Sequence, residues 1–196
     1  MAADGGPNRG AGNGPAMIGW WLCLAAAAVS LAHSRSAKSK LEQIEEGKLP
    51  PGAKVILSED EINSYLRYDY APEIPKGLSD PHIRLEPDRV YGDVLVDFVE
   101  WKAAQGEEPG MLLAFLLRGK KRVEVVARWR SGEGKGRADI EQVKIGGIPV
   151  SAAVVTFLIE NVVQPRYPEA VVERPVELGY GLREIRVERG RAILAR

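Results

Sequence analysis

The middle of the chain alternates between apolar and polar residues in several short stretches, and this period of two predicts β-strands with one buried face. Over residues 122–130, for example, Val123, Val125, Ala127 and Trp129 alternate with residues that are mostly charged. The other strands predicted in this region are residues 82–85, 90–101, 111–117 and 137–145. Because turn residues separate these stretches, the pattern indicates an antiparallel meander of four or five strands.

A predicted strand at residues 53–57 leads directly into a predicted helix from Glu59 to about Tyr70. Ser58 and Glu61 have the spacing of a capping box, in which each side chain accepts a hydrogen bond from the other residue's backbone amide. The buried stripe expected on this helix consists of Ile62, Tyr65, Leu66 and Tyr70. Prolines end the helix, and residues 71–81 are expected to form a loop.

A second helix is predicted over residues 150–163, and it is apolar on almost every side. Such a helix must be covered on most sides, and it is too short to span a bilayer. We therefore expect it in the hollow of a curved sheet, to which residues 182–187 and 191–194 add a terminal hairpin. The predicted fold class is α+β: a strongly curved antiparallel β-sheet packed on one or two α-helices, with an N-terminal apolar signal or anchor helix.

The uncharged run Met17–Ala32 predicts an export signal or a short membrane anchor. The expected organisation is a disordered segment (1–16), a signal peptide or anchor (17–34), a linker (35–52) and a single domain (53–196), with residues 39–47 of the linker left open as a short helix. Basic residues follow the apolar run rather than precede it, which argues against simple export and leaves an uncleaved anchor open beside a cleaved peptide. Either way, we expect the domain at the cell envelope, in the periplasm or another extracytoplasmic space.

Composition and sequence motifs give few indications of a catalytic or metal-binding site. The formal net charge is zero, so we expect no nucleic-acid partner, and the single cysteine, Cys23, excludes an intrachain disulfide. His82 stands alone in the domain, so neither a metal site nor a cofactor is expected. The glycine-rich residues 132–136 precede a strand rather than a helix, which favours a hairpin over a phosphate loop. Basic residues between 120 and 137 form either a solvated sheet face or a patch for anionic headgroups.

Three motifs carry a resemblance to a known family. They are residues 56–66 (ILSEDEINSYL), residues 78–85 (LSDPHIRL) and residues 181–190 (GLREIRVERG). Together they resemble a bacterial family of small exported proteins and lipoproteins of unknown function, whose members are similar to half of a tubular lipid-binding (TULIP-like) fold. The resemblance implies that a lipid or other apolar ligand binds between a helix and a curved sheet. Unlike the lipoprotein members, this chain lacks an acylated cysteine, so attachment would depend on Met17–Ala32.

The leading hypothesis is therefore non-catalytic binding of a lipid or another apolar small molecule at the cell envelope, with membrane contact through Met17–Ala32. The candidate ligand-binding residues are Val94, Val96, Phe98, Val125 and Trp129 on strands, facing Val154, Phe157, Leu158 and Val162 on the second helix. The alternative is a structural or adaptor domain that binds an envelope protein, of unknown identity, through a sheet edge or the basic strand face. Tyr65, Tyr68 and Tyr70 belong either to the core or to a lip at a groove mouth.

Overall fold

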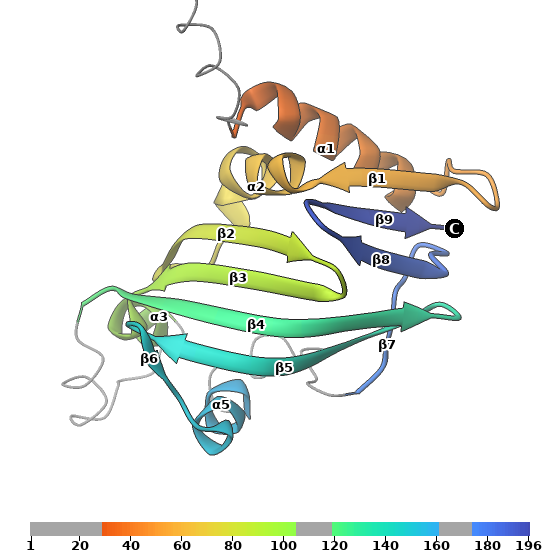
Figure 1. Ribbon diagram of the computed structural model, residues 1–196. Coiled ribbons are helices and arrows are strands. Elements are labelled where there is room, and N and C mark those ends of the chain that lie inside the picture. Colours follow the sequence, from red (N-terminus) through yellow and green to blue (C-terminus); the bar gives the residue numbers. More distant parts are fainter. Residues whose placement is uncertain (1–28, 105–118, 161–173) are drawn as a thin grey trace, which may run out of the picture.

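The computed structural model describes residues 29–104, 119–160 and 174–196, and it has an α+β fold with two antiparallel sheets (Figure 1). The smaller sheet has the strand order β1 (Lys54–Ser58), β9 (Arg191–Ala195), β8 (Glu184–Glu188). The larger sheet is a meander of β2 (Leu78–Glu86), β3 (Arg89–Val96), β4 (Lys121–Gly132), β5 (Lys135–Ile145) and β6 (Ile148–Pro149), with β7 (Val176–Glu177) also paired to β5. The predicted meander and terminal hairpin are confirmed, but the hairpin joins β1 in a separate sheet.

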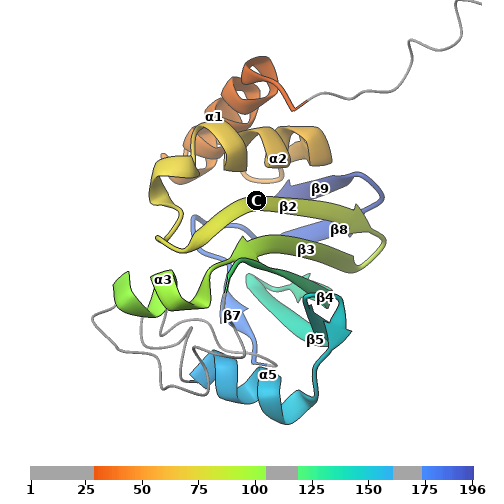
Figure 2. The same cartoon turned by 90° about the vertical axis from the view of Figure 1, so that its left-hand side faces the viewer.

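Two helices, α1 (Leu31–Glu45) and α2 (Glu59–Tyr68), pack together above the smaller sheet (Figures 1 and 2). The main core lies between these helices, the smaller sheet and the first strands of the larger sheet. Its buried side chains are Ala37, Ile44, Val55, Leu57, Leu85, Leu182, Val187, Ala192 and Leu194. We expected residues 35–52 to be a linker, and α1 occupies most of that range, with Ala37 and Ile44 in the core.

The packing of α1 on α2 is mainly polar and repeats one motif. Ser34 and Lys38 both donate hydrogen bonds to Asp69, the latter over 3.1 Å. Ser36 and Lys40 likewise donate to Glu61, both over 2.6 Å. Each carboxylate thus binds a serine and a lysine four residues apart on α1, which explains why Ser34 and Glu61 are buried although they are polar.

These contacts also set the ionisation of the two carboxyl groups. Burial alone would raise the pKa of Glu61, but the hydrogen bonds from Lys40, Ser36 and the Ser58 amide outweigh it, so the pKa lies below its ordinary value. Hydrogen bonds from Ser34 and Lys38 lower the pKa of Asp69 in the same way. Both groups are therefore held as carboxylates by α1 at neutral pH.

The predicted capping box at the start of α2 is confirmed. The Ser58 hydroxyl accepts from the Glu61 amide over 3.2 Å, and the Glu61 carboxylate accepts from the Ser58 amide over 2.8 Å. The predicted buried stripe is only partly correct: Ile62 and Tyr65 pack against the core but are half-buried. The buried residues of α2 are Glu61, Asn63 and Ser64, because this helix contacts α1 and the edge of β2 through polar groups.

The predicted strand over residues 90–101 is wrong beyond Val96. Residues from Phe98 onward form the helix α3 (Phe98–Ala104), because the Asp97 carboxylate accepts hydrogen bonds from the amides of Val99 and Glu100 and starts a helix there. Phe98 therefore lies in a helix, where it packs with Val96 in a second, smaller core cluster. The predicted strand at residues 111–117 lies outside the described residues.

The expectation of a strongly curved sheet around an apolar helix is also wrong. The sheets are not strongly curled, and Figure 1 shows α5 (Ala152–Leu158) beyond the β5 edge of the larger sheet rather than in a hollow. The short strand β6 pairs with β5, and the Val150 amide donates to the Val143 carbonyl over 3.0 Å, so the chain is held at the edge where the helix begins. The larger sheet is contacted by strand β8 near Trp129, and by α3 through the cluster of Phe98, Trp101 and Val96.

Two further sequence features have clear outcomes. The glycine-rich residues form the β4–β5 hairpin, as predicted, with Glu133 and Gly134 both at positive φ, as a two-residue hairpin turn requires. Residues 17–28 of the apolar run lie outside the described residues. Within the described ranges, no helix is long and apolar enough to cross a membrane.

Candidate functional site

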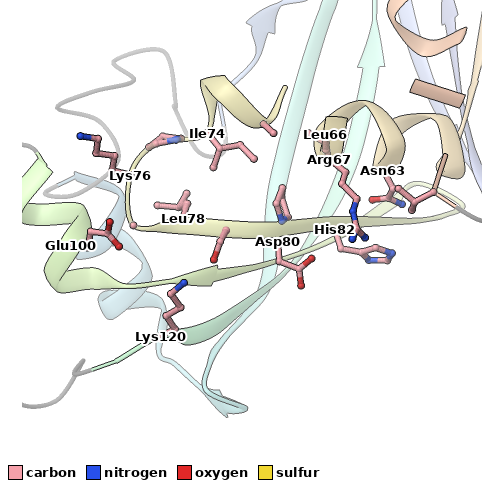
Figure 3. A pocket seen from close by; sticks show the side chains of 16 residues that line it. Asn63, Leu66, Arg67, Ile74, Lys76, Leu78, Asp80, His82, Glu100 and Lys120 are labelled. Atoms are coloured by element: carbon pink, nitrogen blue, oxygen red, sulfur yellow. The ribbon is translucent and has the colours of Figure 1, made fainter. Parts of the chain in front are cut away.

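A cavity of about 560 Å³ lies between the second half of α2, the segment that follows it and the start of β2 (Figure 3). This volume falls within the range of about 300–1,000 Å³ that small-molecule sites occupy. Its apolar lining residues are Val29, Leu66, Ala71, Ile74, Pro75, Leu78 and Pro81. Its polar and charged lining residues are Asn63, Arg67, Lys76, Ser79, Asp80, His82, Glu100 and Lys120, with Gly77 between them.

The α2 wall of this cavity is fixed rigidly to β2. Asn63, Leu66 and Arg67 share one face of the helix because they are three and four residues apart. The Asn63 side chain accepts from the Ile83 amide and donates to the Ile83 carbonyl, both over 2.7 Å, so it replaces the strand partner that edge strand β2 lacks there. Since Asn63 is only 5% exposed, these two bonds hold the helix and strand at a constant separation.

A backbone irregularity shapes the opposite wall. The pairing of β2 with β3 shifts register between Ser79 and His82, and Asp80 within this bulge has a φ of 54°. This left-handed conformation is uncommon outside glycine, although Asp tolerates it better than most residues. Bulges of this kind often redirect side chains next to binding sites. Here the bulge places Asp80 at the rim, with its carboxylate 3.5 Å from the Arg122 guanidinium.

Gly77 brings the start of β2 against α3. A Cβ atom at this position would lie 2.6 Å from the Trp101 amide nitrogen and 2.8 Å from the Asp97 carbonyl oxygen, so only glycine fits without a shift of the backbone. The Asp97 amide also donates to the Gly77 carbonyl over 2.7 Å. This close approach carries Glu100 of α3 to the cavity.

Positive charge predominates at the rim. Arg67, Lys76 and Lys120 line the cavity, and in Figure 3 the Arg67 side chain extends from α2 towards β2. Among the described residues, no carboxylate lies within ion-pair distance of Arg67 or Lys76. Of the two acidic lining residues, Asp80 already interacts with Arg122. A cavity with an apolar wall and an excess of basic groups suits a ligand that combines an apolar part with an anionic group.

The structure places the predicted groove residues in three settings. Val94 and Val125 share one face of the larger sheet, because Val94 pairs with Val123 and Val125 pairs with Gly92, and Val96 lies on the same face at the end of β3. Trp129 is partly buried against the main core, and its indole nitrogen donates to the Ile185 carbonyl over 2.7 Å. The remaining residues, which are on or beyond the helices, are Phe98, Val154, Phe157, Leu158 and Val162.

The helix side of the predicted groove is described at Val154. Val154 is 41% exposed on α5. The Phe157 and Leu158 side chains and the whole of Val162 lie outside what the structure describes. The groove between sheet and helix therefore stays a prediction, and the α2–β2 cavity is a separate candidate. Sequence reasoning missed this cavity because its lining comes from residues 29 to 120, with no short motif to mark it.

Side chains bind backbone polar groups on the edges of three strands. On β2, Asn63 binds Ile83, and the Glu59 carboxylate accepts from the Leu85 amide over 2.7 Å. On β1, Lys40 donates to the Ile56 carbonyl over 2.7 Å. On β8, the Ser131 hydroxyl bonds both the amide and the carbonyl of Ile185 over 2.8 Å. Such caps hinder the addition of a strand from another protein.

The basic strand face is neutralised by neighbouring strands. Glu141 of β5 binds Arg89 and Arg128, and Asp139 binds Arg130 and Arg137. Hydrogen bonds from Arg89 hold the pKa of Glu141 below its ordinary value, and those from Arg137 and Arg130 do the same for Asp139. This charge balance agrees better with a solvated sheet face than with a patch for anionic headgroups.

No protein-family model matches the chain, and no curated protein is significantly similar to it in sequence. The resemblance to the half-TULIP-like family stays a prediction. Within the described ranges, no group of three or more His, Cys, Asp or Glu side chains is placed to hold a metal ion.

Proposed function

We propose that this chain is a membrane-tethered domain that binds an amphipathic ligand with an anionic group in the cavity between α2 and β2. The observation that carries the proposal is a cavity of ligand size that combines an apolar wall with Arg67 and Lys76, which have no carboxylate partner among the described residues. An apolar chain would lie along Leu66, Ile74 and Leu78, and the anionic group would meet the basic rim. Lipids with acidic headgroups have this chemistry.

The start of α1 supports an uncleaved tether. Ser30 caps the helix by accepting a hydrogen bond from the His33 amide over 3.2 Å, and its own amide donates to Ser64 of α2 over 3.0 Å. Cleavage between Ala32 and Ser34 would remove this cap and cut through the first turn of a helix that contributes to the core. We therefore propose that Met17–Ala32 remains attached and holds the domain at the membrane of the cell envelope.

Within the part of the chain that the structure describes, the adaptor alternative is supported at one strand edge. Residues 137–142 of β5 lie between the pairings with β6 and β7, and they have no second strand partner among the described residues. The other edges carry side-chain caps. An extended segment of an envelope protein would therefore add at β5, and ligand binding at the α2–β2 cavity would be independent of it.

The test is native mass spectrometry of the full chain in detergent, titrated with oleoyl-lysophosphatidylglycerol and with its uncharged-headgroup control, oleoyl-lysophosphatidylcholine. The expected result is saturable uptake of one anionic lysolipid. The double variant Arg67→Gln/Lys76→Gln should bind it about tenfold more weakly, a loss of about 1.4 kcal/mol. The charge-matched control is Lys135→Gln/Lys144→Gln, on β5 and outside the cavity lining.

The outcomes separate the two candidate functions. Equal binding of both lysolipids by both double variants would contradict an anionic site at α2–β2. Absence of any saturable uptake would remove the ligand-binding proposal and leave the adaptor alternative at β5. Loss of affinity in the control variant as well would indicate general charge attraction rather than a site.

A further inference from the structure

Exposed apolar side chains gather where α1 begins and α2 ends. Leu31 is 55% exposed, Tyr68 41% and Tyr70 39%. The hydrogen bond from the Ser30 amide to Ser64 places the first turn of α1 beside the last turns of α2. Ser64 and Tyr68 are one helical turn apart, so Tyr68 lies on the side of α2 that meets this end of α1. We call Leu31, Tyr68 and Tyr70 the interfacial patch, and Arg35 and Arg67 are its basic neighbours.

The composition of the interfacial patch fits one kind of partner. Tyrosine prefers the boundary between hydrocarbon and water, where its ring is buried and its hydroxyl stays hydrated. Arg35 and Arg67 are exposed beside it, and basic groups near an anionic lipid surface are attracted to it. Ile148 provides a comparison: it is 70% exposed on β6, at the other end of the larger sheet from β2.

The course of the chain identifies the occupant. The uncharged run Met17–Ala32 ends within the patch, since Leu31 and Ala32 form the first turn of α1. We propose that the interfacial patch rests on the lipid surface into which this run inserts. The inference rests on the proposed tether, and it adds the orientation of the domain. The charged face of the larger sheet, with Glu141 and Asp139, then remains in water.

This orientation also specifies the source of the ligand. Val29 and Arg67 line the cavity, and both adjoin the interfacial patch. The cavity therefore opens near the level of the headgroups of the same bilayer. An anionic lipid of that bilayer would reach Arg67 without crossing water, whereas a free anionic amphiphile would have to arrive from solution. The ligand class assigned to the site is thus a lipid of the anchoring membrane.

The test uses the full chain, with Cys23→Ser, reconstituted in vesicles of phosphatidylcholine and phosphatidylglycerol. Bimane is attached in turn to Leu31→Cys, Tyr68→Cys and the control Ile148→Cys, at a position more exposed than either of the other two. Vesicles containing brominated phosphatidylcholine then report which labels reach the acyl region. Groups lying about 5–10 Å into the interface should lose about half of their fluorescence or more, while the Ile148→Cys label should keep its intensity.

Two results would overturn the orientation. One is equal quenching of the Ile148→Cys label, and the other is unchanged fluorescence of both patch labels. Lysolipid binding in detergent is measured separately and does not depend on orientation. Binding in detergent without quenching of the patch labels would refute only the membrane contact. Quenching of the patch labels without lysolipid binding would refute only the α2–β2 site.

Discussion

Replacing Asn63 should destabilise the protein more than any exposed polar substitution, because this buried side chain binds both backbone polar groups of Ile83 at the edge of β2. In the variant Asn63→Ala, the amide and the carbonyl of Ile83 each lose a hydrogen bond of 2.7 Å. A buried polar group left unsatisfied costs about 1–3 kcal/mol, so two groups give a range of about 2–6 kcal/mol. Ile83 is only half-buried and water can reach part of this edge, so we expect about 3 kcal/mol.

The assay is urea unfolding of the full chain followed by circular dichroism, with Gln142→Ala as the control. Gln142 is an exposed polar residue on β5, and its replacement should change the free energy of unfolding by less than about 0.5 kcal/mol. A second variant, Asn63→Leu, fills the space but makes no hydrogen bonds. It should lose about as much stability as Asn63→Ala if the hydrogen bonds matter more than volume. Losses below about 0.5 kcal/mol in both variants would refute the reasoning.

Three further predictions concern packing, capping and pH. Gly136→Ala should cost about 1–3 kcal/mol in urea unfolding, because the new Cβ would lie 2.5 Å from the Trp129 ring; an unchanged midpoint would contradict this. Ser58→Ala should cost about 1 kcal/mol through loss of the capping box, and Ser58→Thr, which keeps the hydroxyl, should restore most of it. The lowered pKa values of Glu61 and Asp69 stabilise the fold above the ordinary carboxyl values of 4.5 and 3.8, and this contribution is lost as the pH falls through the lowered values. Urea midpoints measured from pH 7 to pH 3 should therefore fall less steeply in Glu61→Gln/Asp69→Asn than in the parent chain, and parallel curves would show that these contacts contribute nothing.

Local patterns predicted the local structure well. The spacing of Ser58 and Glu61 predicted the start of α2, and the glycines near Glu133 predicted a hairpin, because both features depend on neighbouring residues only. The apolar residues after Asp97 continued the strand period and concealed the helix α3. The capping role of Asp97 was the signal that could have revealed it.

Local sequence patterns could not predict how distant strands and helices are arranged relative to one another. Alternation shows which residues face a core but not which strands pair, so the separation of β1, β8 and β9 into their own sheet could not be predicted. Helix α1 was missed in part because its contacts with α2 are polar, and a stripe that includes Ser34 does not look like a buried face. The candidate cavity was also missed because its lining is brought together by long-range folding: Arg67, Lys76 and Lys120 line one cavity only after the chain has folded.

The paired contacts of α1 have a mechanical consequence. A helix fastened at one point can swivel, but α1 is fastened at Asp69 and again at Glu61, eight positions apart on α2. Torque applied at the first turn of α1 is therefore carried into α2 as a rigid-body rotation. Since Asn63 locks α2 to β2, the same rotation reaches the sheet without bending a loop. A tilt of the preceding segment would thus rotate the whole domain. The cavity would change its orientation but keep its shape.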